Sequence, residues 1–486
     1  MMGSLGRNGA AVSAAAIAER VAHMKQAHVQ DGPASLALRR DRLERAAELL
    51  VSNQQALVAA MNADYGQRSR TQSLSSDLLA SVRALTHARE HVANWMRPGA
   101  DSEPFPGAQA RIQYQPLGVV GIISPWNFPV NLAFSPLAGI LAAGNRALLK
   151  PSELTPNTAE LLAELVDRRF DADEFALVLG DAAVGTAFGG QAFDHLIFTG
   201  STAVARHVMR AAAENLVPLT LELGGKSPVI VAPDADLRQV AERVMTVKTF
   251  NAGQICLAPD YILLPEGSVE AFAEHARDVI AQAYPTLADN PDYTAIVNTR
   301  HFDRLQQLLA DAAARGARVL TLNPAAETLA RDTGHKIAPT LILDADDSML
   351  ALQEEIFGPI LPVLTYRHLD DAIAYVNARP RPLAAYFFGH DAAEQARVAE
   401  HTTSGALVVN DVMTHAMVEE LPFGGVGPSG MGRYHGQHGF QTFSHPKAVL
   451  IQSPGGESNL RMRAPYRAEA TGQIEQALQR ELQNRG

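Results

Sequence analysis

Short apolar runs alternate with amphipathic helical stretches from about Pro116 onwards, and this alternation constrains the fold more than any other feature of the chain. Strands are expected at 119–124, 147–150, 175–178, 196–198 and 219–223. The stretches between them, including 136–143, 158–168 and 203–215, have helical patterns. Strands that alternate with helices predict a doubly wound parallel sheet, which binds its ligand at the carboxyl ends of the strands. The first half of the chain is therefore a candidate nucleotide-binding domain.

A second alternating series follows and predicts a second α/β unit of similar style. Its expected strands lie near 229–231, 261–264, 340–343, 384–388 and 406–409, with helices such as 269–283 and 302–315. Ahead of both series, residues 33–98 show the helical spacing of apolar side chains. The alanine-rich stretch up to Gln30 is expected to be an exposed amphipathic helix rather than a secretion signal, because its apolar run is weak and the acidic Glu19 follows it. A cytoplasmic protein is therefore expected.

Length and composition narrow the class of protein. The 486 residues exceed the usual size of one hydrophobic core and predict several domains. Apolar residues make up 47% and charged residues 19%, and no apolar run reaches about 18 residues, so we expect a soluble globular protein without a membrane span. The net charge of −11 and the lack of Lys and Arg clusters argue against nucleic acid as a partner.

Cys256 is the only cysteine of the chain, and it lies between an apolar helical stretch and an apolar strand. A single thiol forms no internal disulfide and no cysteine metal cluster, which leaves packing in a core or covalent chemistry. A cysteine that fills a core usually lies in an unbroken apolar run, whereas Ala252, Gly253 and Gln254 are small or polar neighbours that let a ligand approach. Cys256 is therefore a candidate nucleophile.

Two turns after the first strands could hold a cofactor. Residues 198–202 (FTGST) follow a strand and open a helix, where free N–H groups and the Ser201 hydroxyl can bind a pyrophosphate. The same residues would also make an ordinary Ser or Thr helix cap. Residues 150–153 (KPSE) place a lysine and a carboxylate at a strand end, where they either hold ribose hydroxyls or are simply solvated.

Seven segments together make the chain resemble an aldehyde dehydrogenase. They are 124–129 (SPWNFP), 150–153 (KPSE), 198–202 (FTGST), 221–228 (LELGGKSP), 253–256 (GQIC), 354–359 (EEIFGP) and 422–425 (PFGG). They occur in the order of that family, and the resemblance covers about residues 33 to 465. Residues 258–261 (APDY) and 430–436 (GMGRYHG) resemble the class 3 branch. The N-terminal region with 64–66 (DYG) and 68–69 (RS) is similar to bacterial coniferyl aldehyde dehydrogenases.

The resemblance implies three catalytic residues. Oxidation of an aldehyde to an acid needs a nucleophile, a hydride acceptor, an oxyanion site and a base that activates water. Cys256 matches the nucleophile, Asn127 would stabilise the oxyanion together with the Cys256 N–H, and Glu222 matches the base. A glutamate between leucines in a buried strand is expected to have a raised pKa. Without the resemblance, Asn127 would be a turn-forming residue and Glu222 an edge-strand carboxylate facing water.

The resemblance also implies an NAD site. The adenosine ribose would lie at Lys150 and Glu153, the pyrophosphate at Gly200 and Ser201, and the nicotinamide end at Glu355 and Phe357. Trp126 and Ser152 belong to the same cofactor-binding segments. A carboxylate such as that of Glu153 favours a free 2′-hydroxyl and repels a 2′-phosphate, so NAD is preferred over NADP. Class 3 relatives that carry this segment accept both, so NADP stays open.

Two other groups of residues have simpler interpretations. His435, His438 and His445 lie close together in the sequence. Metal sites usually also contain carboxylate or thiol ligands, so these histidines are expected to hold no metal. Ile474, Leu478 and Leu482 form one narrow apolar stripe on a C-terminal helix. That stripe is expected to dock on the body of the protein or on a second subunit, and it is too polar overall for a membrane anchor.

The expected architecture is an aldehyde dehydrogenase-like α/β fold with two doubly wound domains and a small β hairpin. The NAD-binding domain is expected at 1–107 and 118–223, the catalytic domain at 224–409, bridging elements at 108–117 and 410–460, and a tail helix at 461–486. The hairpin would combine 108–117 with strands near 442–451. The resemblance implies that this hairpin pairs two subunits into a homodimer.

The sequence leaves alternatives open for the substrate and for the type of reaction. Coniferyl-like aromatic aldehydes are the first expectation and medium-chain aliphatic aldehydes the second. An acylating dehydrogenase would pass the thioester to coenzyme A instead of water, but Glu222 argues against this. A non-catalytic protein on the same fold would not need Cys256, Asn127 and Glu222 together.

Overall fold

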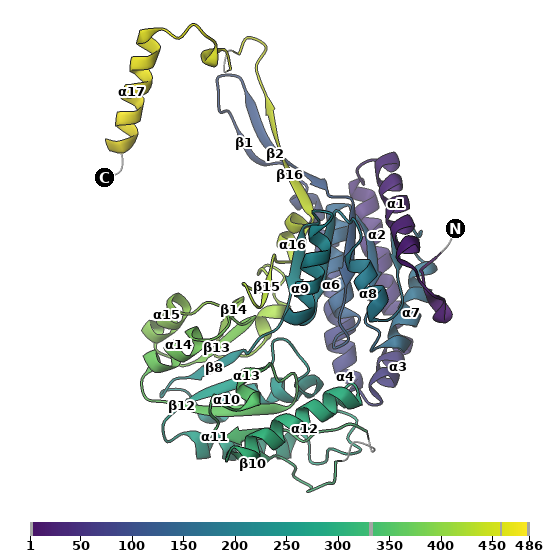
Figure 1. Ribbon diagram of the computed structural model, residues 1–486, viewed down its shortest axis with the longest axis vertical. Coiled ribbons are helices and arrows are strands. Elements are labelled where there is room, and N and C mark those ends of the chain that lie inside the picture. Colours follow the sequence, from purple (N-terminus) through teal and green to yellow (C-terminus); the bar gives the residue numbers. More distant parts are fainter. Residues whose placement is uncertain (1–2, 330–333, 457–458, 484–486) are drawn as a thin grey trace. The chain divides into compact units, whose positions relative to one another are not determined.

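A computed structural model describes residues 3–329, 334–456 and 459–483 of the chain (Figure 1). The chain divides into two compact units, one comprising Met1–Trp95 and Gln115–His445 and the other Met96–Tyr114 and Pro446–Gly486. The first unit contains both of the large sheets. Within the described ranges, no helix combines the length and the apolar character that crossing a membrane requires.

The first sheet has the strand order β15-β7-β6-β3-β4-β5. The members are β3 (Val119–Ile123), β4 (Arg146–Lys150), β5 (Phe175–Leu177), β6 (His195–Thr199), β7 (Leu219–Glu222) and β15 (Gly430–Met431). Strands β3 to β7 run parallel, and the short β15 pairs antiparallel with β7. The order reverses between β3 and β6, and in such sheets the ligand binds outside the carboxyl ends of the strands at this point. The doubly wound sheet is confirmed, with strand ends within one residue of those expected.

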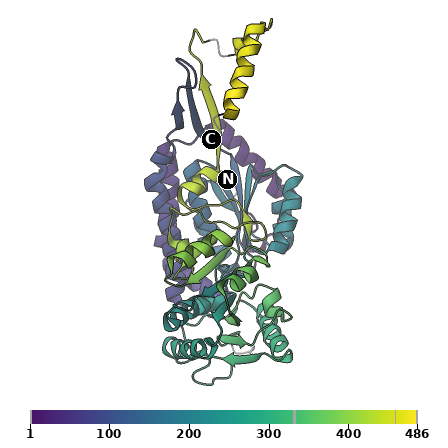
Figure 2. The ribbon, with the colours of Figure 1, turned by 90° about the vertical axis from the view of Figure 1, so that its left-hand side faces the viewer.

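Helices lie on both faces of this sheet (Figures 1 and 2). They are α1 (Ala14–Asp31), α6 (Asn131–Ala143), α7 (Pro156–Asp167), α8 (Ala182–Gly189) and α9 (Thr202–Ala213). Helix α1 was expected to be exposed, but Ile17, Val21 and Met24 are buried in the core formed with Val119 and Leu148. These three side chains recur at helical spacing, so a single stripe suffices to dock the helix on the sheet.

The expected helical region ahead of the sheet is confirmed and contains an irregular turn. Its elements are η1 (Arg7–Gly9), α2 (Leu36–Ser52), α3 (Gln54–Tyr65), α4 (Arg70–Gln72), a π-helical segment η2 (Ser73–Leu79) and α5 (Ala80–Trp95). A π-helical turn is rare and is often found at functional sites. In η2 it directs the side chains of Ser73, Asp77 and Leu78 into the protein interior.

The second sheet has the order β10-β11-β12-β9-β8-β13-β14 and is parallel except for β10. The strands are β8 (Pro228–Val231), β9 (Tyr261–Pro265), β10 (Arg318–Thr321), β11 (Thr340–Leu343), β12 (Ile360–Tyr366), β13 (Ala384–Phe388) and β14 (Ala406–Val409). The helical elements that follow β8 in the sequence are α10 (Leu237–Thr249), η3 (Phe250–Gly253), α11 (Val269–Ala283), α12 (Thr299–Ala314), α13 (Leu350–Gln353), α14 (Leu369–Asn377), α15 (Ala392–His401), η5 (Thr414–Met417) and α16 (Gly436–Thr442). The last of these, α16, packs against α6 and α5 instead of this sheet. The second α/β unit is confirmed, although β10 and β12 were not expected.

The smaller unit contains a short sheet of the order β1-β2-β16. Its elements are β1 (Gly99–Ser102), β2 (Gln109–Pro116), β16 (Ser444–Ile451), η6 (Leu460–Met462) and α17 (Ala468–Gln483). The pairing of β2 with β16 joins the two segments from which the hairpin was expected. Part of the range 410–460 lies elsewhere, because β15 completes the first sheet. There it covers the edge of β7, whose backbone groups would otherwise be unpaired.

Candidate active site

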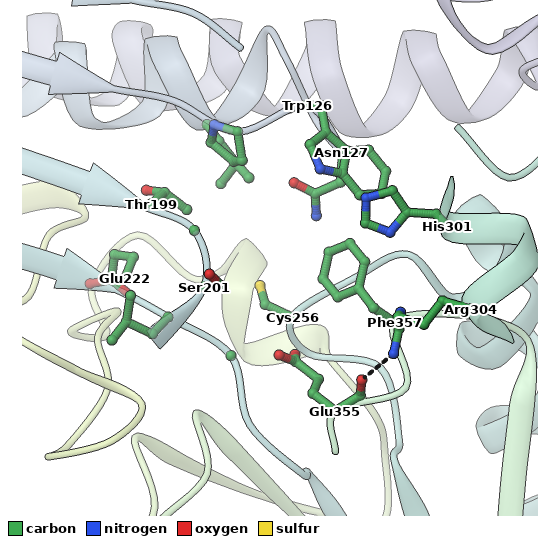
Figure 3. A pocket seen from close by; sticks show the side chains of 15 residues that line it. Trp126, Asn127, Thr199, Ser201, Glu222, Cys256, His301, Arg304, Glu355 and Phe357 are labelled. Carbon is green, nitrogen blue, oxygen red and sulfur yellow. Dashed lines mark hydrogen bonds between the residues drawn. The ribbon is translucent and has the colours of Figure 1, made fainter. Parts of the chain in front are cut away.

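One pocket lies where the carboxyl ends of β3, β6 and β7 face loops of the second sheet (Figure 3). It brings together eight of the side chains and turns selected from the sequence: Trp126, Asn127, Gly200, Ser201, Glu222, Cys256, Glu355 and Phe357. Seven further residues line it: Pro125, Leu132, Thr199, Leu223, Gly224, His301 and Arg304. Segments as far apart in the sequence as Pro125 and Phe357 thus share one cavity at the ligand-binding edge of the first sheet.

Cys256 follows a tight turn that only a glycine can complete. Asn251 and Ala252 have left-handed φ values of 50° and 52°, and Gly253 follows with φ 71°. A Cβ atom on Gly253 would lie 2.3 Å from the carbonyl oxygen of Gly358. The turn is therefore pressed against the loop that carries Phe357, and Cys256 emerges from it partly exposed.

The surroundings of Cys256 disfavour its thiolate. Burial, together with the negative charges of Glu355 and Glu222, raises the thiol pKa to about 12. The backbone N–H groups of Cys256 and Leu257 act in the opposite direction and lower it. The thiol is thus protonated at neutral pH, so a nucleophilic role needs a nearby base.

Glu222 is such a base. It ends β7 between β6 and β15, and only 2% of its surface is exposed, so its carboxylate does not face water. Neither carboxylate oxygen has a hydrogen-bond partner among the described residues. Burial raises the pKa of Glu222 well above its usual value. When ionised, such a carboxylate is a stronger base than an exposed one, so it can accept a proton from a neighbouring thiol or from water.

Asn127 points its side-chain amide into the same space as Cys256 (Figure 3). Its Nδ2 donates a hydrogen bond to the carbonyl oxygen of Gln254, 3.1 Å away. An amide nitrogen carries two hydrogens, so the second can serve a ligand. Asn127 and the backbone N–H of Cys256 therefore form a candidate oxyanion site.

Glu355 and Phe357 form the opposite wall of the pocket. The Glu355 carboxylate lies against Gly224, where a Cβ atom would come within 2.1 Å of Oε1. Burial and the charge of Asp260 raise the pKa of Glu355 to about 8, although the N–H of Gly225 and the Lys226 ammonium lower it. Glycine at 224 is thus required by the carboxylate that packs on it.

Arg304 and His301, on α12, were not selected from the sequence. Arg304 donates to the carbonyl oxygen of Glu355 at 3.2 Å and also to that of Ile356, which fixes this loop (Figure 3). The His301 ring lies 5.1 Å from the Trp126 ring, and burial lowers its pKa to about 4. The expected helix began at Phe302, so both residues lay near an ill-defined boundary with no motif to mark them.

Gly200 and Ser201 lie at the mouth of the pocket, where α9 begins. Ser201 Oγ accepts a hydrogen bond from the N–H of Val204 at 3.4 Å, so Ser201 is the N-cap of α9, as the simpler interpretation of this turn expected. The Gly200 N–H donates to the Glu222 carbonyl oxygen at 3.0 Å. Capping and ligand binding are compatible here, because the Ser201 side chain also lines the pocket.

Lys150, Ser152 and Glu153 do not line this pocket. Lys150 ends β4, and Ser152 and Glu153 follow it and line a second hollow together with Gly6, Gly9, Leu179 and Gly180. Lys150 Nζ donates to the carbonyl oxygen of Pro151 at 2.7 Å and to Glu153 Oε2 at 3.3 Å. The two hollows lie at the same edge of the first sheet, beyond the ends of neighbouring strands.

The three histidines selected near the C-terminus differ in burial: His435 is buried, His438 is partly exposed and His445 is exposed. The buried His435 ring stacks on the Phe423 ring at 4.9 Å and meets Tyr434 at 4.8 Å. In the part of the chain that the structure describes, no group of three or more His, Cys, Asp or Glu residues has the arrangement of a metal site.

Comparisons with known proteins agree with this geometry. Residues 7–449 match the model of the aldehyde dehydrogenase family. A coniferyl aldehyde dehydrogenase of Pseudomonas sp. (strain HR199 / DSM 7063) is 62% identical over 465 residues, covering 96% of this chain and 97% of that protein. The resemblance inferred from the sequence is thereby confirmed.

Solved structures match over nearly the whole chain. AldH of Staphylococcus aureus in a substrate-bound state matches with a TM-score of 0.89 and 35% identity, covering 95% of this chain and 99% of that one. An aldehyde dehydrogenase of Mycobacterium tuberculosis solved with NAD+ matches with a TM-score of 0.81 and 28% identity, covering 92% of each chain. The chain belongs to the aldehyde dehydrogenase family.

Proposed function

We propose that this chain oxidises an aldehyde to a carboxylic acid, with NAD as the hydride acceptor and Cys256 as the covalent nucleophile. The observation that carries the proposal is that Cys256, Asn127 and Glu222 line one pocket at the ligand-binding edge of a doubly wound sheet. Each of the three has the chemistry that one step of the oxidation needs. A purely structural pocket would have no use for a buried carboxylate without hydrogen-bond partners.

The pocket fits a nicotinamide dinucleotide. Free N–H groups at the start of α9, with Gly200 and Ser201, suit a pyrophosphate. The rings of Trp126 and Phe357 pack edge to face, with centroids 5.3 Å apart, and both line the cavity. Glu355 would bind the nicotinamide ribose, while Lys150 and Glu153 would bind the adenosine ribose in the neighbouring hollow. The relative from Mycobacterium tuberculosis, which was solved with NAD+, supports this assignment. When bound, NAD supplies the hydride acceptor.

In the first half of the reaction Cys256 bonds to the aldehyde carbon. The thiol proton passes to Glu222 as the sulfur attacks, and the carbonyl oxygen becomes an oxyanion. The Asn127 amide and the Cys256 N–H donate hydrogen bonds to this oxygen, and one such donor lowers the barrier by about 3 kcal/mol. Loss of the hydride to the bound NAD would then leave a thioester on Cys256, and Glu222 would release the thiol proton to solvent, so that its carboxylate is available again for the second half.

In the second half Glu222 accepts a proton from water, which attacks the thioester carbon. The C–S bond breaks, the carboxylic acid leaves, and Cys256 recovers its proton. This role of Glu222 favours hydrolysis over transfer to coenzyme A. As substrate, a coniferyl-like aromatic aldehyde is favoured by the relative from Pseudomonas, and a medium-chain aliphatic aldehyde is the second candidate.

The test is the variant Cys256→Ala, which removes the only thiol of the chain. We expect aldehyde oxidation to fall to less than about a hundredth of the wild-type rate, while the dissociation constant for NAD stays unchanged. Absorbance of the reduced cofactor gives the rate with aromatic and aliphatic aldehydes, with NAD and NADP. Turnover above a few per cent of wild type would exclude the covalent mechanism, and dependence on added coenzyme A would favour the acylating alternative.

A further inference from the structure

We propose that Arg68, Gln72 and Asp77 are positioning residues. They hold the oxyanion donor Asn127 and the nucleophile Cys256 in the correct position relative to each other. The inference rests on the proposed function and adds residues that none of its steps uses. All three lie on one short stretch that includes α4 and the π-helical segment η2. The stretch forms hydrogen bonds with the turns that carry Asn127 and precede Cys256.

Arg68 and Asp77 form a buried ion pair behind Asn127. Both side chains are fully buried, and Arg68 Nη2 donates to Asp77 Oδ2 at 2.7 Å. The other guanidinium nitrogen, Nη1, donates to the carbonyl oxygen of Asn127 at 2.8 Å. Asp77 Oδ1 accepts from the N–H groups of Val130 and Asn131 at 3.0 and 3.2 Å. One ion pair therefore holds the turn from Asn127 to Asn131 at both ends.

The ion pair also replaces a missing helix cap. Helix α6 begins directly after this turn, and its preceding residue, Val130, offers no side-chain cap. The Asp77 carboxylate binds the free N–H groups there, where a negative charge is favourable. The side chain of Asn127 is thus carried by a turn whose backbone has little freedom.

Gln72 connects the same stretch to the turn of the nucleophile. Its Oε1 accepts from the N–H of Asn251 at 2.9 Å, within the left-handed turn that precedes Cys256. Asn251 Nδ2 in turn donates to the carbonyl oxygens of Asn127 and Gln254, at 3.1 and 3.2 Å. The two catalytic turns are therefore hydrogen-bonded to each other and to the same support, which consists of Arg68, Gln72 and Asp77.

A support of this kind matters because the reaction is sensitive to geometry. The sulfur and the oxyanion donor must approach one carbonyl group together, and a displacement of about 1 Å can cost about a hundredfold in rate. The buried pair is also poorly suited to a merely stabilising role, since burying two charges gives little net stability. Its hydrogen bonds instead end on the backbone of the turn that carries Asn127, and Gln72 alone reaches the turn that precedes Cys256.

The experiment compares Arg68→Met with a matched control, Arg42→Met. Arg42 is equally buried and pairs with Glu174 at 3.0 Å, but it contacts neither catalytic turn. Stopped-flow absorbance would give the rate of the first reduced-cofactor burst, and calorimetry the melting temperature. We expect both variants to melt at lower temperature, and only Arg68→Met to show a burst slowed at least about tenfold with NAD affinity unchanged.

The outcomes separate the two proposals. A folded Arg68→Met with a wild-type burst rate would overturn the positioning role, as would an equal slowing in Arg42→Met. If Arg68→Met does not fold, Gln72→Met decides, since it removes the acceptor for the Asn251 N–H and the Thr294 hydroxyl but leaves the ion pair intact. A slowed burst there supports the inference, and a wild-type burst overturns it. Lack of aldehyde oxidation in the wild type would instead overturn the proposed function itself.

Discussion

Cys256 and Glu222 each carry a negative charge in one step of the proposed reaction, yet the pocket disfavours that charge on both. The pKa of the thiol is raised to about 12 and that of the carboxyl group is raised well above its usual value. Because each lies within the electrostatic reach of the other, ionisation of one opposes ionisation of the other. A single proton moving between sulfur and carboxylate avoids the cost of two buried charges. The reactivity of the Cys256 thiol as a function of pH therefore reports directly on the electrostatics of the site.

The first prediction concerns alkylation of Cys256 by iodoacetamide. Below its pKa, the thiolate fraction rises about tenfold per pH unit, and a pKa of about 12 places no plateau in the neutral range. We therefore expect the alkylation rate of the free enzyme to keep rising between about pH 7 and 10. The chain has no other cysteine, so mass spectrometry reports this residue alone and Cys256→Ala gives the background. A plateau reached below about pH 8 would contradict the raised pKa.

The second prediction concerns Glu153 and the choice of cofactor. Glu153 pairs with Lys150 at 3.3 Å, and its charge would oppose a 2′-phosphate. In Glu153→Ser that charge is lost and the Lys150 ammonium becomes available to a phosphate. We expect the ratio of kcat/KM for NAD to that for NADP to fall by about tenfold or more. Glu160→Ser, on the exposed side of the same hollow, is the control. An unchanged ratio in Glu153→Ser would remove Glu153 from the cofactor site.

At the scale of elements, the sequence predicts what local patterns encode. The strands β3 to β9 and most helices follow from apolar runs and helical spacing, because burial against a sheet imposes both. Strand β12 was missed although it lies inside the second sheet, since Pro362 interrupts its apolar run and a proline argues against an inner strand. Helix α6 begins at Asn131 rather than Pro136 because its cap is Asp77, more than fifty residues away. No local pattern carries that information.

The candidate site likewise contains residues that the sequence identifies and residues that only the structure identifies. Cys256, Glu222 and Asn127 are recognisable because each lies in a motif with its own chemistry. His301 and Arg304 reach the pocket only through the packing of α12, and the support formed by Arg68, Gln72 and Asp77 arises from contacts between distant segments. For Lys150 and Glu153 the sequence identified the motif, but it did not predict that these residues lie at a second hollow outside the main pocket. Motifs identify reacting groups, whereas tertiary contacts decide what holds them.

At the scale of the whole molecule, the smaller unit leaves apolar side chains uncovered. Leu450 and Ile451, neighbours on β16, are 56% and 47% exposed, although successive strand residues point to opposite faces. Ile474, Leu478 and Leu482 of α17 are all exposed, so the stripe expected on this helix covers no core of its own. We propose that a second copy of the chain covers these surfaces in a homodimer.

Sedimentation velocity would test the dimer. We expect the wild type to sediment as a dimer and the double variant Leu450→Lys and Ile451→Lys to shift towards the monomer, because charges are disfavoured at the centre of an apolar interface. The control Leu216→Lys changes a leucine that is 89% exposed on the larger unit and should leave the dimer intact. A wild-type protein that stays monomeric at micromolar concentration would rule out the dimer.

The most direct test of the proposed chemistry traps its covalent intermediate with Glu222→Gln. This variant keeps the shape of the side chain but removes the base of both halves of the reaction. Formation of the thioester should slow, but the thiol can still lose its proton to solvent before it attacks, whereas the attacking water has no other base, so hydrolysis should slow far more. Mixing it with NAD and aldehyde should give a burst of reduced cofactor approaching one per active site, and mass spectrometry of the quenched protein should place the acyl group on Cys256. A burst without an acyl group on Cys256, or steady turnover near the wild-type rate, would contradict the mechanism.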